Sequence, residues 1–131
     1  MILRPVEPKV KVKQIALDDC EEELCIKLRE GGKYVDELVI LPDKSVIVVE
    51  HAKWPTAYEG AQALSSFRKL IELEVEVAAI VIVGKKGFDK RDKGLIAQAL
   101  RSVSSNHRIP LFLVRPKQHI KVKSIELVVT N

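Results

Sequence analysis

The chain has 131 residues, of which 47% are hydrophobic and 31% charged, a composition typical of a globular protein rather than a disordered one. This length suits a single domain (residues 1–131) and is too short for two. No apolar run approaches the roughly 18 residues of a membrane span, and the N-terminus lacks the apolar segment of a secretory signal. We therefore expect a cytoplasmic protein.

The first part of the chain predicts a strand, a short helix and a β-hairpin. Residues 9–17 alternate polar and apolar side chains, as in a strand with one solvated face, and their lysines suit a sheet edge. Residues 18–30 favour a short helix with acidic residues in its first turn, although their apolar run also fits a strand. Residues 34–41 and 45–52 are rich in Val, Ile and Leu, and Pro42-Asp43-Lys44 between them is a turn sequence. These two segments predict a hairpin.

The second part predicts alternating helices and strands. Thr56 and Glu59 have the spacing of a capping box that begins a helix over residues 57–74, and residues 77–83 form an apolar strand. Strand, helix and strand in this order imply a right-handed crossover with parallel pairing. The remaining expected segments are a basic loop at 84–94, an amphipathic helix at 95–103, a strand at 109–114 and a last, alternating edge strand at 120–129. Together they predict an α/β domain, with a mixed sheet of five to six strands flanked by helices.

Charge is distributed unevenly along the chain. The net charge is +4, but residues 1–84 hold 11 basic and 15 acidic side chains, whereas residues 85–131 hold 11 basic and 3 acidic ones. A basic C-terminal third attracts polyanions, nucleic acid first. The alternative is the solvated surface of a heat-adapted protein, which the low count of six Gln and Asn also fits. The candidate nucleic-acid contacts are Lys85, Lys86, Lys90, Arg91, Arg115 and Lys117.

The expected hairpin carries a candidate catalytic cluster. Asp36 and Glu37 begin its first strand, and Glu50 and Lys53 lie at the end of its second, so antiparallel pairing should bring an acid of each strand together. Two converging carboxylates are suitable ligands for Mg²⁺ or Mn²⁺, and a nearby lysine can stabilise charge developing on a phosphate. A divalent ion held in this way serves phosphodiester hydrolysis.

Several of these residues have structural interpretations as well. Glu50 follows four apolar residues and should be partly buried, so a salt bridge to Lys53 or Lys33 would satisfy it as well as a metal ion would. We interpret Trp54 as a cover over the crossover helix, with a stacking platform for a base as the alternative. The two cysteines are too few for a disulfide scaffold and match no zinc motif, so we expect ordinary half-buried thiols.

The hairpin sequence, from Tyr34-Val35-Asp36 through the turn to Glu50-His51-Ala52-Lys53, resembles the core of the PD-(D/E)xK nuclease superfamily. Archaeal Holliday junction resolvases and other restriction-endonuclease-like folds belong to it. The resemblance covers residues 18–84. It implies that Asp36 and Glu50 bind Mg²⁺ and that Lys53 is the catalytic lysine. It also implies an assisting glutamate on the preceding helix, for which Glu22 and Glu23 are candidates, and it places Gln62 near the site.

The resemblance departs from the family pattern at the lysine. The family has Glu-x-Lys, whereas this chain has Glu-x-x-Lys, so in a regular strand Lys53 would point away from Glu50. Lys53 joins the site if the strand bulges or ends there. We therefore expect a Mg²⁺-dependent DNA endonuclease, paired as a homodimer like other small nucleases. The alternatives are an inactive nuclease fold that binds nucleic acid or assembles with a partner, and a plain protein-interaction domain.

Overall fold

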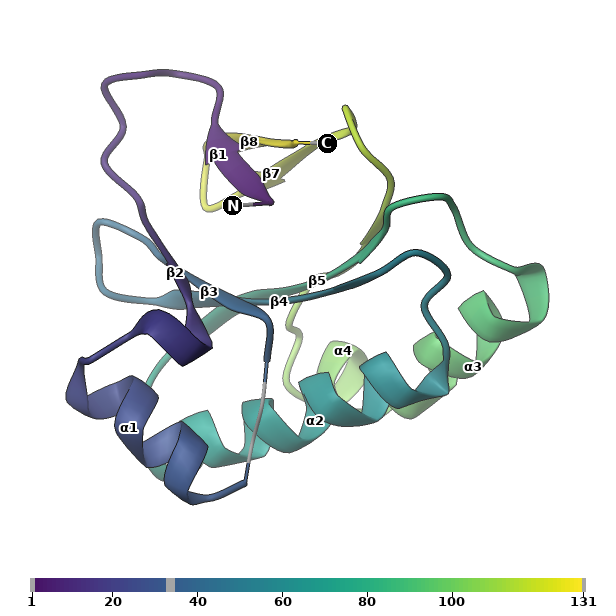
Figure 1. Ribbon diagram of the computed structural model, residues 1–131, viewed down its shortest axis with the longest axis horizontal. Coiled ribbons are helices and arrows are strands. Elements are labelled where there is room, and N and C mark those ends of the chain that lie inside the picture. The colour runs from purple at the N-terminus through teal and green to yellow at the C-terminus, as the bar shows by residue number, and fades with distance from the viewer. Residues whose placement is uncertain (1, 33–34, 131) are drawn as a thin grey trace.

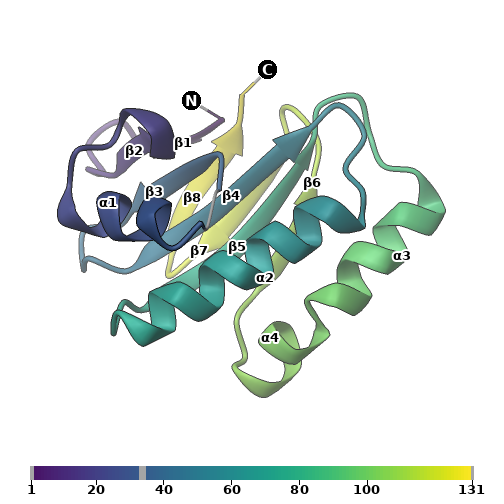
Figure 2. The same cartoon turned by 60° about the horizontal axis from the view of Figure 1, so that its bottom comes forward.

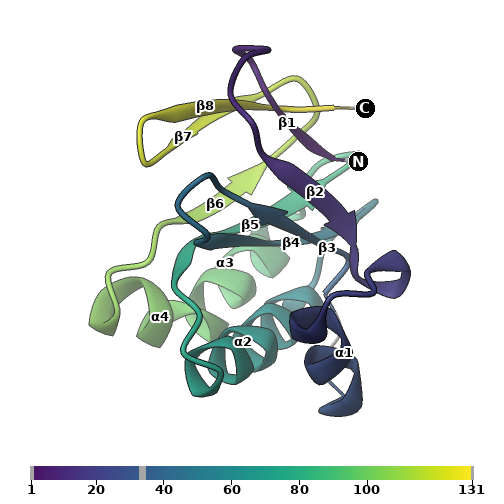
Figure 3. The same cartoon turned by 90° about the vertical axis from the view of Figure 1, so that its left-hand side faces the viewer.

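The computed structural model describes residues 2–32 and 35–130. Within these residues the chain forms three layers, with a five-stranded mixed sheet in the middle, four helices on one of its faces and a three-stranded antiparallel sheet on the other (Figures 1 and 3). The predicted α/β class and the five-stranded mixed sheet are confirmed. No helix in the described part of the chain has both the length and the apolar character to cross a membrane.

The central sheet has the strand order β2-β3-β4-β5-β6. Its strands are β2 (Lys13–Ala16), β3 (Glu37–Ile40), β4 (Val46–Ala52), β5 (Val77–Gly84) and β6 (Leu111–Val114). The predicted hairpin is the antiparallel pair β3 and β4, in which Glu37 lies opposite Val49. The predicted parallel pairing of β4 with β5 is present, and β2 lies at a sheet edge as expected.

The helices cover one face of this sheet (Figure 2). They are α1 (Glu23–Glu30), α2 (Ala57–Glu72), α3 (Lys90–Ala99) and α4 (Arg101–Asn106), with a 3₁₀ turn, η1 (Leu17–Asp19), before α1. The predicted capping box begins α2, because the Thr56 hydroxyl accepts from the Tyr58 amide at 3.2 Å and the Thr56 amide donates to Glu59 Oε2 at 2.8 Å.

The expected basic loop is shorter than its sequence suggested. Asp89 caps α3 by accepting hydrogen bonds from the Arg91 and Asp92 amides, so Lys90 and Arg91 lie in the first helical turn rather than in a loop. The helix expected after this loop is split at Leu100 into α3 and α4.

The C-terminal segment is a hairpin rather than one edge strand. It consists of β7 (His119–Val122) and β8 (Ile125–Val129), and the two turn residues Lys123 and Ser124 have φ values of 49° and 68°. Strand β1 (Leu3–Pro5) pairs with the other side of β8, which makes β8 the central strand of the second sheet. The edge position expected for this segment is therefore wrong, since β1 is too short to show a strand pattern of its own.

The two cysteines are joined in a disulfide rather than held as thiols. Cys20 and Cys25 lie on either side of the start of α1, with their Cα atoms 5.7 Å apart, and both side chains are buried. The bond connects the segment that follows η1 to α1. The expectation of thiols is wrong because the turn between η1 and α1 brings two nearby residues into bonding distance.

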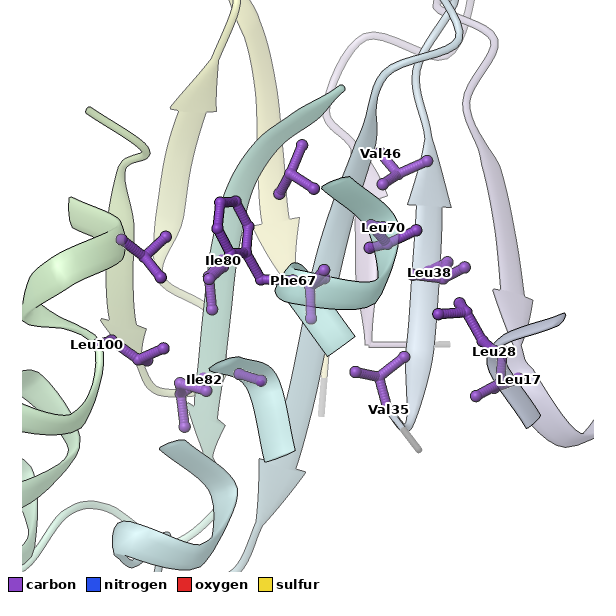
Figure 4. Packing of buried hydrophobic residues seen from close by; sticks show 14 of the residues in the cluster. Leu17, Leu28, Val35, Leu38, Val46, Phe67, Leu70, Ile80, Ile82 and Leu100 are labelled. Atoms are coloured by element: carbon purple, nitrogen blue, oxygen red, sulfur yellow. The ribbon is translucent and has the colours of Figure 1, made fainter. Parts of the chain in front are cut away.

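The central sheet has a hydrophobic core on each face. Val46 and Val48 pack toward the helices, where Phe67 and Leu70 of α2 cover the sheet (Figure 4). The alternate residues of the strand, Ile47 and Val49, pack toward the three-stranded sheet. Strand β4 is thus covered on both faces. The alternation continues along β4 and places the next even-numbered residue, Glu50, on the helix side.

Candidate functional site

The structure brings Asp36 and Glu50 together at one end of the hairpin. Because Glu37 lies opposite Val49, Asp36 directly precedes β3 at the position that faces Glu50. The Asp36 carboxylate Oδ2 accepts a hydrogen bond from the His51 amide at 2.8 Å, and its side chain is 40% exposed. Glu50, in contrast, is only 5% exposed. The pair therefore combines one solvent-accessible carboxylate, held by the backbone of the neighbouring strand, with one buried carboxyl group.

Glu50 is a buried acid with no cation paired to it among the described residues. Burial, together with the negative charges of Asp36 and Glu59, raises its pKa to about 9, although a hydrogen bond from the Asp36 backbone amide acts in the opposite direction. Its Oε1 is buried and accepts no hydrogen bond from the described residues, none of which forms an ion pair with it. Lys53 therefore does not neutralise Glu50, and Lys33, the other expected partner, lies outside the described residues. A buried acid whose pKa is raised and which lacks a compensating cation is a candidate for a functional site.

Glu37, the competing acid, has a structural role on the opposite face of the sheet. Its side chain is 5% exposed, and its two carboxylate oxygens accept from the Ile2 amide at 3.2 and 3.1 Å. These bonds tie the residue before β1 to the central sheet. Glu37 is therefore separated from Glu50 by the sheet itself.

Glu59 is a third acid near Glu50 that sequence reasoning did not assign to the site. Its carboxylate serves the capping box of α2, and its charge still acts on Glu50. The sequence feature that could have indicated Glu59 is the short connection between β4 and α2, which places the first turn of the helix near the end of the strand. Among the described residues, however, no group of three or more His, Cys, Asp or Glu side chains is arranged to hold a metal ion. Asp36 and Glu50 remain the two acids that the hairpin strands bring together at this end of the sheet.

Lys53 lies just beyond the end of β4. The strand ends at Ala52, so strand alternation no longer sets the direction of the Lys53 side chain. The side chain is exposed, and its backbone carbonyl accepts from the Lys86 amide at 3.0 Å. No described residue forms an ion pair with Lys53, which leaves its ammonium group available to a ligand.

The other residues that the resemblance suggested have partners elsewhere. Glu22 pairs with Lys13, and Glu23 pairs with Lys27 at 3.0 Å. The Gln62 amide donates to the Tyr58 hydroxyl at 2.7 Å on the surface of α2. We find no contact of these three side chains with Asp36 or Glu50 among the described residues, whereas Glu59 occupies that neighbourhood.

Basic residues gather where the parallel strands end. Strands β4, β5 and β6 run in the same direction, so the segments that follow them share one edge of the sheet. The cations that directly follow these strands are Lys53, Lys85, Lys86 and Arg115. In open α/β sheets, ligands bind beyond the carboxyl ends of the parallel strands.

A cleft of about 370 Å³ lies at this edge. Its lining combines cations with an amide and apolar side chains, namely Phe88, Lys90, Lys93, Leu113, Arg115 and Gln118. We call it the basic cleft. Two of the predicted nucleic-acid contacts, Lys90 and Arg115, line it, and Lys93 and Gln118 are members that the sequence did not single out.

The remaining predicted contacts lie around the basic cleft or apart from it. Lys85 and Lys86 are exposed in the loop after β5, and Arg91 is exposed in the first turn of α3. Lys117 lines a different cavity, with Arg4 and residues of β7 and β8. The predicted basic residues therefore do not all line one cavity.

Comparison with known proteins adds no relative: no family model matches the sequence, and no match was found among the curated proteins or the solved structures.

Proposed function

We propose that this protein is a Mg²⁺-dependent phosphodiesterase acting on nucleic acid. The observation that carries the proposal is the pairing of Asp36 with the buried Glu50, whose Oε1 has no donor among the described residues, at an end of the sheet where cations follow the strands. A buried carboxyl group whose oxygen lacks a donor needs a compensating cation to be charged. A carboxylate pair at the same end of the sheet as Lys53, Lys86 and Arg115 fits a metal ion together with a phosphate.

Each residue would contribute a distinct part. Asp36 and Glu50 would hold the ion, and the His51 amide already orients the Asp36 carboxylate. When bound, Mg²⁺ would activate a water molecule and offset charge on the phosphate. Glu50 would release its proton on taking a cation, because the ion replaces the charge compensation that the fold lacks. Lys53 would stabilise negative charge on the phosphate from the end of β4, and the cations after β5 and β6 would hold the flanking backbone.

The direct test is cleavage of labelled DNA in three forms: single-stranded, duplex and branched. We expect Mg²⁺-dependent cleavage of at least one form. The cleavage rate should fall by about a hundredfold or more in Asp36→Asn and Glu50→Gln. Glu21→Gln, at an exposed glutamate away from the hairpin, is the matched control and should retain activity. Equal activity in wild type and in both site variants would show that a contaminant or another site cleaves the DNA.

A second candidate function is nucleic-acid binding without cleavage. It is favoured by the absence of a three-ligand group among the described residues and by the Glu-x-x-Lys spacing. It predicts binding that weakens with salt, at a slope of about 0.9 per phosphate contact on a logarithmic plot, and no product at any Mg²⁺ concentration. Absence of both cleavage and binding would refute both functions and favour a protein-interaction domain.

Two further expectations belong to this proposal. We expect a cytoplasmic location. The Cys20–Cys25 disulfide is compatible with it if the protein is from a hyperthermophile, whose intracellular proteins often contain disulfides and share this charged, amide-poor composition. A homodimer would place two sites on one substrate, and sedimentation velocity at micromolar concentration tests it.

A further inference from the structure

Trp54 lies at the surface of the carboxyl edge of the central sheet. It directly follows Lys53 beyond the end of β4, and its side chain is 54% exposed. The interpretation of Trp54 as a cover over the crossover helix is therefore wrong. A single exposed apolar side chain is common at protein surfaces, so the surroundings of the indole decide what it can bind.

The loop after β5 supports this indole from one side. Gly87 has a φ of 132°, and a β-carbon at this position would lie 3.3 Å from Trp54 Cζ3 and 3.7 Å from Cη2. Gly84 has a similar role, since a β-carbon there would lie 2.3 Å from the Gly87 carbonyl oxygen. Both glycines allow the loop to fold tightly against the ring, and the Lys86 amide holds the Lys53 carbonyl at 3.0 Å. One side of the Trp54 ring is thus packed against the loop backbone at Gly87.

Cations and the basic cleft border the exposed part of the ring. The same β-carbon on Gly87 would lie 4.0 Å from Arg115 Cδ, so Arg115 and Trp54 flank a single point of the loop. Arg115 lines the basic cleft, and its backbone amide donates to Gln118 Oε1 at 2.7 Å. Lys53 and Lys86 lie next to Trp54 and Gly87 in the chain. An apolar partner protein would gain little from the positive charges around the indole. A polyanion with flat aromatic groups, in contrast, matches both the cations and the exposed indole.

We propose that Trp54 is a stacking platform for an unpaired base, and that the phosphates of the same strand lie along the basic cleft through Lys90, Lys93 and Arg115. The substrate class is then nucleic acid with a single-stranded segment, because bases within a continuous duplex do not expose a face for stacking. This inference deepens the proposed function and rests on nucleic acid being the ligand, but it does not depend on cleavage.

The chain contains one tryptophan, so fluorescence excited selectively at tryptophan rather than at the two tyrosines reports on Trp54 alone. The probes are a single-stranded oligonucleotide, the same strand carrying abasic sites, and a blunt duplex, each titrated into the full protein in EDTA. We expect strong quenching with the single strand, and weak quenching with the abasic strand and the duplex. Stacking on an aromatic side chain is commonly worth tenfold or more in affinity, so Trp54→Ala should weaken single-strand binding by about tenfold in an anisotropy titration.

Matched variants separate stacking from charge. Trp54→Ala should leave the salt dependence of binding unchanged, whereas Arg115→Ala should lower the slope by about one while the quenching persists. Ile71→Ala, at an exposed apolar residue near the other end of α2, should change neither the salt dependence of binding nor the quenching.

The outcomes distinguish this inference from the proposed function. Equal quenching by the abasic strand, or unchanged single-strand affinity in Trp54→Ala, overturns the platform even if Mg²⁺-dependent cleavage is present. A change of oligomeric state in Trp54→Ala, together with no quenching of the wild type by any of the three oligonucleotides, identifies a protein interface instead and also overturns it. Quenching by the single strand that the abasic strand does not reproduce, in a protein that cleaves nothing, supports the platform and refutes only the phosphodiesterase.

Discussion

Replacing Glu50 with glutamine should stabilise the metal-free protein, and more so as the pH rises. Glutamine has nearly the shape of a protonated glutamate but no charge to lose. In the unfolded chain Glu50 ionises with an ordinary pKa of 4.5, whereas burial and the neighbouring acids raise its pKa in the fold to about 9. Between these two values the native state holds a proton that the unfolded state has released. The free energy of unfolding therefore falls as the pH increases.

The size of the effect follows from the same two values. Each pH unit in this interval changes the stability contribution of one group by about 1.4 kcal/mol, so at pH 7 the wild type should be less stable than Glu50→Gln by about 3 kcal/mol. Below the unfolded pKa the penalty disappears, and above the folded pKa it reaches its maximum because both states are then ionised.

The assay is chemical denaturation followed by circular dichroism, in EDTA with the disulfide intact, at several pH values from 5 to 8. The difference in unfolding free energy between Glu50→Gln and wild type should grow steadily with pH, while Glu21→Gln should follow the wild-type curve. A constant difference across this range would mean that Glu50 is already charged in the native state, and would refute the argument from burial.

Magnesium should counteract this penalty in the wild type. A ligand that binds only the native state stabilises it by mass action, about 1.4 kcal/mol for each tenfold excess over its dissociation constant. The gain should be larger at pH 8 than at pH 6, where protons compete for Glu50, and should be largely absent in Glu50→Gln. An equal gain in both proteins would place the ion elsewhere.

Two further predictions concern the folded scaffold. Ser124→Gly should stabilise the protein by about 0.5–1 kcal/mol, since Ser124 has a φ of 68° that glycine adopts without strain; an unchanged denaturation midpoint would show that the β7–β8 turn is not strained. Breaking the Cys20–Cys25 bond with Cys25→Ser should cost about 2 kcal/mol for so short a loop, and reduction of the wild type should give the same loss; a reduced wild type as stable as the oxidised one would contradict this value.

The hairpin and the crossover could be predicted because their signals are local. Pro42-Asp43 marks the turn between two apolar runs, and Asp43 Oδ1 does accept from the Ser45 amide at 2.9 Å. Thr56 and Glu59 mark the start of α2 by a capping pattern that needs no tertiary contact. The turn between β7 and β8, in contrast, contains Lys123-Ser124 rather than Gly, Asn or Asp, so the chain carries no turn signal where the last segment reverses.

The amino-acid pattern was enough to predict the hairpin and an acid from the start of its first strand beside Glu50, with Asp36 and Glu37 as the candidates. The register observed in the folded chain selects Asp36, and the layers on either side of the sheet give the acids their different surroundings. The three-stranded sheet captures Glu37 through the Ile2 amide, and the helix layer buries Glu50 without giving its Oε1 a donor. The support of Trp54 by Gly87 likewise depends on loops that are distant in sequence. Periodicity and turn chemistry are properties of short segments, whereas burial, charge compensation and exposure depend on which layer covers each face of the sheet.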